Sequence, residues 1–207
     1  MTTTARRLTK KGQATRDRIV GAAAQLMLEQ GVARTTIEDI QAAAGVSPSQ
    51  LYHYFPGKDA LVSAVVDHQA SQVLHIHQAC LQSVDSIDSL RQWRDVMVNI
   101  ITEMHCVGGC PLGSLASDLS DADPLARTQL AAAFSRWQEL IRQGLADMQQ
   151  RGELAADANP GELAVAMLAA VQGGLLLSQV NRDPAPLRIA VDTMIDHLHN
   201  LTRTAIP

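Results

Sequence analysis

Apolar residues recur along this chain mostly at intervals of three and four positions, which is the spacing of helices that bury one face. Glycine and proline stand at the ends of these stretches, where they stop or start helices. No stretch has the two-residue alternation of a strand. The sequence therefore predicts an all-α fold of about nine helices. We expect them over residues 15–31, 36–45, 48–55, 58 to about 80, 89–105, 112–119, 124–151, 161–180 and 186–202.

The second and third of these helices carry the clearest boundary signals. Thr36 can cap the first turn of one helix, and Gly45 can adopt the left-handed conformation that ends it. Ser47 then caps the next helix, Pro48 suits its first turn, and Gln50 completes a capping box. Two short helices joined by a tight turn that contains glycine form a helix-turn-helix, which lays its second helix in the major groove of DNA.

The second helix of this pair has an apolar side and a polar side. Leu51 and Phe55 lie four residues apart and should face the core. The outer side keeps the hydrogen-bonding side chains Ser49, Gln50, Tyr52 and His53. An outward Gln50 could form two hydrogen bonds with adenine, which are worth about 1–3 kcal/mol of discrimination.

This stretch closely resembles the DNA-binding domain of the TetR (tetracycline repressor) family of bacterial transcriptional regulators. The resemblance is carried by Thr36, Ile40, Gly45, Val46, Ser47, Leu51, Tyr52, Tyr54, Phe55, Lys58 and Leu61. Beyond residue 60 the chain agrees with the family in length and helical character. The resemblance implies a ligand-responsive regulator that is not an enzyme: a repressor that a small apolar or electrophilic effector releases from a palindromic operator.

The resemblance also implies which residues touch DNA. These are Arg34, Thr36, Ser47, Ser49, Gln50, Tyr52, His53 and Lys58. The chain departs from the family pattern in two respects: Gln41 stands where a small residue is usual, and Ser49 and Gln50 replace the common pair. The second departure means that an operator preference cannot be transferred to this chain.

Charge is divided unevenly along the chain. Residues 1–60 carry a net charge of +3, and residues 61–207 carry −7. We expect residues 1–60 to be the DNA-binding domain, with a basic N-terminal arm that contains Arg6, Arg7, Lys10 and Lys11. Residues 61–207 should form the helical domain that binds the effector and dimerises. A basic head on an acidic body suits a polyanionic partner at one end.

Composition narrows the class of protein further. Three cysteines without a secretory signal indicate reduced thiols in the cytoplasm rather than a disulfide scaffold. The most apolar run, residues 163–177, is interrupted by Gln172 and two glycines and is too short to span a bilayer. We therefore expect a cytoplasmic protein with no membrane partner. No motif indicates a cofactor.

The last two helices have apolar faces that favour a dimer interface. They hold Leu163, Met167, Ala170, Gly174 and Leu177 on one helix, and Val191, Met194, Ile195 and Leu198 on the other. Two such pairs could form a four-helix bundle in a homodimer, which would read two half-sites about 34–36 Å apart. The alternative is that both faces cover the core of the body itself.

Large apolar side chains on the inward faces of the body helices indicate an adaptable effector pocket. The candidates are Trp93, Met97, Met104, His105, Cys110, Phe134 and Trp137, with His68 and His75 as further polar groups. Ordinary core packing is the alternative for each of them.

Cys110 lies in a Gly-Cys-Pro element that resembles a feature of some TetR-like regulators. At the start of a helix its thiolate can be stabilised by the helix dipole and become reactive; a buried, unreactive thiol is the alternative. Cys110 and His105 could also serve a cysteine hydrolase, or bind a metal together with Cys106. The first lacks any supporting catalytic motif and the second lacks a fourth ligand, so we expect neither.

Overall fold

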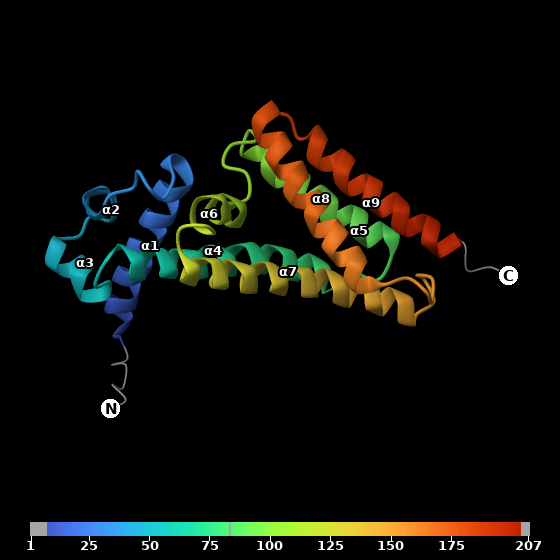
Figure 1. The fold of residues 1–207 in the computed structure, drawn as a ribbon, viewed down its shortest axis with the longest axis horizontal. Coiled ribbons are helices and arrows are strands. Elements are labelled where there is room, and N and C mark those ends of the chain that lie inside the picture. The colour runs from blue at the N-terminus through green and yellow to red at the C-terminus, as the bar shows by residue number, and fades with distance from the viewer. Residues whose placement is uncertain (1–7, 83, 204–207) are drawn as a thin grey trace.

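The computed structural model describes residues 8–82 and 84–203, with side chains up to residue 201. Within these residues it contains helices and no strands (Figure 1). The helices are α1 (Lys10–Gln30), α2 (Ile37–Ala44), α3 (Pro48–Tyr54), α4 (Lys58–Leu81), α5 (Ile87–Glu103), α6 (Pro111–Leu119), α7 (Pro124–Gln150), α8 (Pro160–Asn181) and α9 (Ala185–Arg203). The expected all-α class and its nine helices are confirmed for the described part of the chain.

Helices α1, α2 and α3 form a head at one end of the molecule (Figure 1). Helix α1 begins at Lys10, five residues before the predicted start, because Thr9 caps it by accepting a hydrogen bond from the Gly12 N–H. The residues between Lys10 and Thr15 are mainly polar and exposed, so apolar periodicity could not reveal this turn. Arg6 and Arg7 of the predicted basic arm lie outside the described residues.

The caps predicted for α2 and α3 are present. The Thr36 hydroxyl accepts from the Asp39 N–H, and the Asp39 carboxylate accepts in return from the Thr36 N–H. Gly45 ends α2 in the left-handed conformation, with φ of 61°. Ser47 and Gln50 form the predicted capping box at the start of α3. These local hydrogen bonds fix where the two helices of the helix-turn-helix begin.

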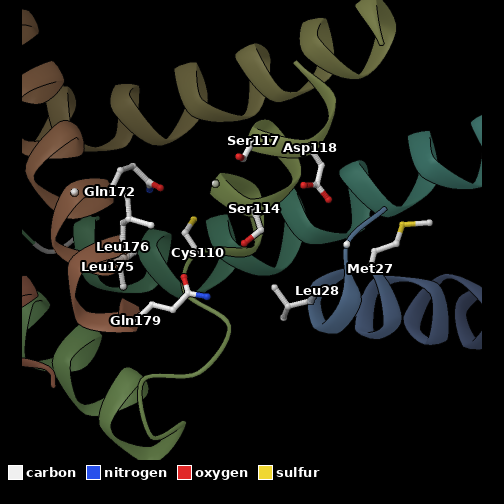
Figure 2. A pocket seen from close by; sticks show the side chains of 13 residues that line it. Met27, Leu28, Cys110, Ser114, Ser117, Asp118, Gln172, Leu175, Leu176 and Gln179 are labelled. Atoms are coloured by element: carbon white, nitrogen blue, oxygen red, sulfur yellow. The ribbon is translucent and has the colours of Figure 1, made fainter. Parts of the chain in front are cut away.

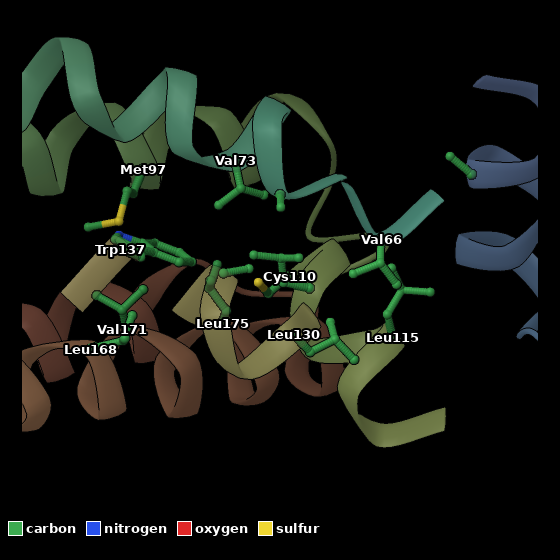
Figure 3. Close-up of a cluster of buried hydrophobic side chains, with 14 of the residues drawn as sticks. Val66, Val73, Met97, Cys110, Leu115, Leu130, Trp137, Leu168, Val171 and Leu175 are labelled. Atoms are coloured by element: carbon green, nitrogen blue, oxygen red, sulfur yellow. The ribbon is translucent and has the colours of Figure 1, made fainter. Parts of the chain in front are cut away.

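Helix α4 runs from the head into the body and packs against α1 at one end and along α7 for much of its length (Figure 1). Buried side chains on α4, from Leu61 and Val65 to Val73 and Leu81, join the core of the head to that of the body. Figure 3 shows this cluster, with Val66 and Val73 facing Leu115 and Leu175 around Cys110. Because one apolar core spans both parts, a shift in the body can reach the head through packed side chains.

Helices α8 and α9 form an antiparallel pair that covers α7 and α5. Gly174 permits their close approach, because a Cβ at this position would lie 2.7 Å from Leu187 Cα. The Ser178 hydroxyl also accepts a hydrogen bond from the Leu187 N–H at 3.1 Å. These contacts hold the two helices in one relative position.

Helix α8 contains the apolar run that the sequence indicated to be too short for a membrane. The whole helix has 22 residues and a mean hydropathy of 1.8 in its most apolar window, so length and composition alone would permit a span. Its buried side chains, such as Met167 and Val171, pack inside the chain as those of a core helix do. Its other side exposes apolar residues, among them Leu176 and Val180.

We predict that Gly174→Ala lowers the free energy of unfolding by about 1–3 kcal/mol, because the new methyl group meets backbone atoms that cannot move aside without separating α8 from α9. The matched control is Gly21→Ala in α1, where a Cβ meets nothing within 4 Å. Gly21→Ala should raise stability by up to about 1 kcal/mol. Urea denaturation measures both changes, and equal effects of the two substitutions would contradict the role given to Gly174.

Candidate DNA interface and effector cavity

The outer side of the head gathers most of the predicted DNA-binding side chains. Tyr52 is 53% exposed although it is aromatic. The other exposed members of the predicted set are Arg34, Thr36, Ser47, Ser49, Gln50 and His53. A polar row with an exposed tyrosine on a short helix is suited to contacts with bases and phosphates.

The Gln50 side chain caps the start of α3 and is exposed on this surface. Its Oε1 accepts a hydrogen bond from the Ser47 N–H at 3.0 Å, and its own N–H donates to the Ser47 hydroxyl at 3.3 Å. A carboxamide that caps a helix through its oxygen still presents the two N–H donors of its nitrogen. The side chain that caps α3 therefore keeps hydrogen-bond donors on the exposed side of this helix.

Lys58 is half-buried and holds the turn between α1 and α2. Its ammonium donates to the Val32 carbonyl at 2.8 Å. The Val32 N–H donates to Asp118 Oδ2 at 2.9 Å, so the same residue is also tied to α6. The Val32 backbone thus joins α4, α6 and the head, a connection that the sequence did not indicate because its partners lie 26 and 86 residues away.

Two further cations of the head serve its packing. The Arg18 guanidinium donates from Nε to the Ala44 carbonyl at 2.8 Å, at the end of α2. Arg16 lies over the Phe55 ring, with 5.3 Å between Cζ and the ring centroid. Part of the positive charge counted in residues 1–60 is therefore engaged within the head.

A cavity of about 170 Å³ lies in the body between α4, α5, α7 and the segment around Cys110; we call it the inner cavity. It is lined by Gln69, Gln72, Val73, Ile76, His77, Met97, Ile100, Ile101, Met104, Gly109, Cys110, Pro111, Trp137 and Leu175. Apolar atoms make up most of its wall. Such a space accepts an apolar ligand.

The structure brings four of the seven predicted effector residues to this cavity: Met97, Met104, Cys110 and Trp137. Trp93 lies behind its wall, Phe134 is half-buried elsewhere on α7, and His105 is exposed in a left-handed conformation. Sequence reasoning missed the face of α4 that supplies Gln69, Gln72 and His77. The signal available for it was the helical spacing i, i+3, i+4, i+7 and i+8 of Gln69, Gln72, Val73, Ile76 and His77.

His77 is one of two buried titratable groups of the inner cavity; the other is Cys110. Its Nδ1 accepts a hydrogen bond from Trp93 Nε1 at 3.0 Å, and its ring stacks on Trp137 with centroids 4.1 Å apart. Burial disfavours the charged ring and lowers the pKa of His77 to about 4. The side chain is therefore neutral at pH 7, where it acts as an aromatic, hydrogen-bonded part of the wall.

Cys110 is buried at the start of α6 (Figure 3). Burial raises the pKa of its thiol, against hydrogen bonds from Gly113, Gln172 and Leu112 that lower it. The structure thus favours the buried, protonated thiol over the reactive thiolate. Among the described residues, no three His, Cys, Asp or Glu side chains gather as metal ligands would.

The residues predicted for the dimer interface occupy two environments. Met167, Gly174, Val191, Ile195 and Leu198 are buried within the chain, Leu163, Ala170 and Met194 are partly buried, and Leu177 is exposed. A different strip of α8 remains open, and we call it the α8 outer face: Val165, Ala166, Ala169, Gly173, Leu176, Leu177 and Val180. Contiguous exposed apolar residues of this kind mark an interaction surface.

Two family models match the chain. One described as "Tetracyclin repressor-like, C-terminal domain" matches residues 86–194, and one described as "Bacterial regulatory proteins, tetR family" matches residues 19–65. The repressor DhaR of Mycobacterium sp. (strain GP1) is 27% identical over 83% of this chain and 86% of its own length. The regulator TtgR of Pseudomonas putida is 30% identical over 81% of both chains.

Solved structures of TetR-family regulators have the same fold as this chain. A TetR transcriptional regulator from Chloroflexus aurantiacus has a TM-score of 0.78 and 28% identity, covering 91% of this chain and 96% of its own. The regulatory protein TetR from Rhodobacter sphaeroides has a TM-score of 0.80 at 22% identity, covering 88% and 98%, which supports the fold. Regulators of this kind bind operator DNA and small-molecule effectors and act as dimers. The chain belongs to the TetR family of bacterial transcriptional regulators, which are ligand-responsive DNA-binding proteins and not enzymes.

Proposed function

We propose that this protein is a cytoplasmic, homodimeric repressor that binds a pseudo-palindromic operator and is released by a small effector whose apolar body occupies the inner cavity. The observation that carries the proposal is the connection at Val32. Asp118, on α6 in the body, accepts a hydrogen bond from the Val32 N–H, which lies in the turn before the helix-turn-helix. We divide the chain into a DNA-binding domain, residues 1–60, and an effector-binding and dimerisation domain, residues 61–207.

The DNA contacts are proposed for the exposed side of the head. Helix α3 enters the major groove, with Ser49, Gln50 and His53 toward base edges and Tyr52 toward phosphate or base. The remaining contacts to the DNA backbone come from Arg34, Thr36, Ser47 and Lys58. Support comes from the exposure of these side chains, and for Lys58 from its position at the start of α4.

The dimer is proposed to form through the α8 outer face. Its exposed residues include Leu176, Leu177 and Val180, and the small residues Ala169 and Gly173 allow a partner helix to approach closely. The predicted interface residues that are buried, such as Met167 and Val191, then hold α8 and α9 together within each protomer. Two helix pairs can meet about one two-fold axis and place the recognition helices on two half-sites.

The effector is proposed to occupy the inner cavity. Its wall is apolar, its histidine is neutral at pH 7, and its cysteine is a protonated thiol. The Trp137 indole N–H is buried and has no hydrogen-bond partner among the described residues. An apolar molecule with one hydrogen-bond acceptor would satisfy that donor, and this favours an apolar over an electrophilic effector.

Release is proposed to follow from movement of α6. Cys110 and Pro111 begin α6 and line the inner cavity, and Asp118 near its end holds the Val32 N–H. A ligand that displaces the start of α6 would move Asp118, and through Val32 and α4 would change the separation of the two recognition helices. Coupling of this kind is reciprocal, so operator DNA must weaken effector binding by the same factor.

The experiment that tests the function is a fluorescence anisotropy titration of the protein with DNA flanking its own gene. It is done at two salt concentrations, with a scrambled duplex as competitor. Salt-sensitive binding that survives the competitor supports a sequence-specific regulator. Equal binding to scrambled DNA, across duplexes that tile both flanks, would refute it.

We predict that Gln50→Ala mainly relaxes sequence preference, reducing the ratio of specific to non-specific affinity by about tenfold, because one base contact is lost. Lys58→Ala should instead lower the affinity for every sequence and flatten the salt slope by about one unit. Both are measured in the same titration. Gln50→Glu is the matched control for folding, since its carboxylate can still accept from the Ser47 N–H. Identical effects of Gln50→Ala and Lys58→Ala on all duplexes would contradict the assigned roles.

A further inference from the structure

A second and larger cavity, of about 530 Å³, lies beside the inner cavity (Figure 2). We call it the outer cavity. It is bordered by the end of α1, by one side of α6 and by α8, where Leu28, Ser114, Ser117, Asp118, Gln172 and Gln179 stand around it. Cys110 and Leu175 line both cavities, so these two side chains form the wall between them.

The two cavities differ in chemistry. The inner cavity is apolar, whereas the outer one offers two serines, two glutamines and a carboxylate. Asp118 is the one charged side chain among the residues that line the outer cavity. One of its oxygens accepts from the Val32 N–H, and a carboxylate has room for about three further hydrogen bonds.

Three helices bring their C-terminal ends to the outer cavity, and α6 also brings its N-terminal residues Cys110 and Gly113 to it. Leu28 and Gly31 lie at the C-terminal end of α1, Ser117 and Asp118 in the last turn of α6, and Gln179 in the last turn of α8. The C-terminal end of a helix carries a partial negative charge from its free carbonyl groups. Arg182, which ends α8, donates to the Cys106 carbonyl and does not line the cavity.

Helix α6 sets the distance between the two regions. Cys110, at its start, touches the inner cavity, and Asp118 lies eight residues further along the same helix. At 1.5 Å per residue this separates them by about 12 Å. A single elongated molecule could therefore occupy both cavities by passing Cys110 and Leu175.

We infer that the effector site is bipartite and takes an amphipathic amine: an apolar body in the inner cavity and a positively charged head about 12 Å away, paired with Asp118. The inference rests on the proposed effector function and names the class of ligand for it. It also gives the ligand a direct contact with the carboxylate that holds Val32.

The test uses three probes with the same skeleton: 8-phenyloctylamine, 8-phenyloctan-1-ol and 8-phenyloctanoic acid. The chain has two tryptophans, Trp93 and Trp137, and both lie at the inner cavity or its wall. Intrinsic fluorescence of the full-length protein without DNA therefore measures occupancy. Asp118 is exposed, and an exposed ion pair is worth at most about 1 kcal/mol, so we expect the amine to bind about three to five times more tightly than the alcohol or the acid.

Asp118→Asn is the decisive variant, because an asparagine oxygen can still accept from the Val32 N–H while the charge is removed. The advantage of the amine over the alcohol should disappear, so that the two probes bind within about 1.5-fold of each other. Asp121, like Asp118, is exposed but does not line the cavity, so Asp121→Asn should leave the advantage unchanged. The short probe 2-phenylethylamine cannot span 12 Å and should bind wild type and Asp118→Asn equally.

The inference is overturned if the acid binds as tightly as the amine, or if Asp118→Asn keeps the wild-type preference for the amine. Failure of the proposed function is a separate outcome, because it would appear in the DNA titration without any probe. Binding of the amine with its Asp118 dependence supports the bipartite site whatever the operator sequence is.

Discussion

Leu177→Asp is expected to convert the protein into a folded monomer and to lower its operator affinity by at least about a hundredfold. Leu177 is 54% exposed on the α8 outer face, so an aspartate there is solvated in the separate protomer. In the proposed dimer each protomer would bury one unpaired carboxylate, at a combined cost of at least about 3 kcal/mol. A monomer contacts one half-site, which removes most of the operator affinity.

Analytical ultracentrifugation gives the oligomeric state, and fluorescence anisotropy gives the affinity. The matched control is Leu125→Asp, because Leu125 is 62% exposed at the start of α7, away from the α8 outer face. It should remain dimeric with wild-type operator affinity. A Leu177→Asp protein that stays dimeric would place the interface elsewhere on the chain.

Stability is expected to fall by about 3 kcal/mol between pH 7 and pH 4 through His77 alone. Burial lowers the pKa of His77 to about 4 in the folded chain, whereas the ordinary value is 6.5. Between these two values the unfolded state binds a proton that the folded state does not, so acid favours unfolding. The contribution is complete above pH 6.5 and is lost as the pH falls toward 4.

The measurement is urea denaturation of wild type and His77→Gln from pH 7.5 to pH 4. Glutamine can still accept from Trp93 Nε1, and it does not titrate. Asp39 and Glu139, whose pKa values are lowered by hydrogen bonds from Thr36 and Arg142, titrate equally in both proteins and cancel in the difference. Parallel pH profiles for the two proteins would show that His77 is not buried as a neutral ring.

The parts of the fold that the sequence predicted best are those fixed by neighbouring residues. The capping boxes at Thr36 and Ser47, the left-handed Gly45 and the proline starts of α6 and α7 each depend on a few adjacent positions. The start of α1 was placed too late, because a polar turn has no apolar face to reveal it. Helix caps can be predicted from one sequence because the residues that form them are neighbours in the chain.

The functional regions were less predictable because they depend on packing between distant helices. Periodicity identified the apolar faces of α8 and α9, but it could not say which apolar side meets the chain's own core and which stays open. Met167 and Leu177 belong to one predicted set, yet the first is fully buried and the second is exposed. The same limit applies to His77, whose environment is created by Trp93 and Trp137 from two other helices.

The joint between body and head at Val32 is built from main-chain atoms: its N–H binds Asp118 and its carbonyl binds Lys58. Alanine scanning would therefore pass over this residue as a signalling element, since Val32→Ala keeps both backbone groups. An amide-to-ester replacement at the Val32 nitrogen, made by semisynthesis, removes the donor alone. If the proposed route is the one used, the signal depends on the path of the main chain, and relatives could vary in side chain at residue 32 and still transmit it.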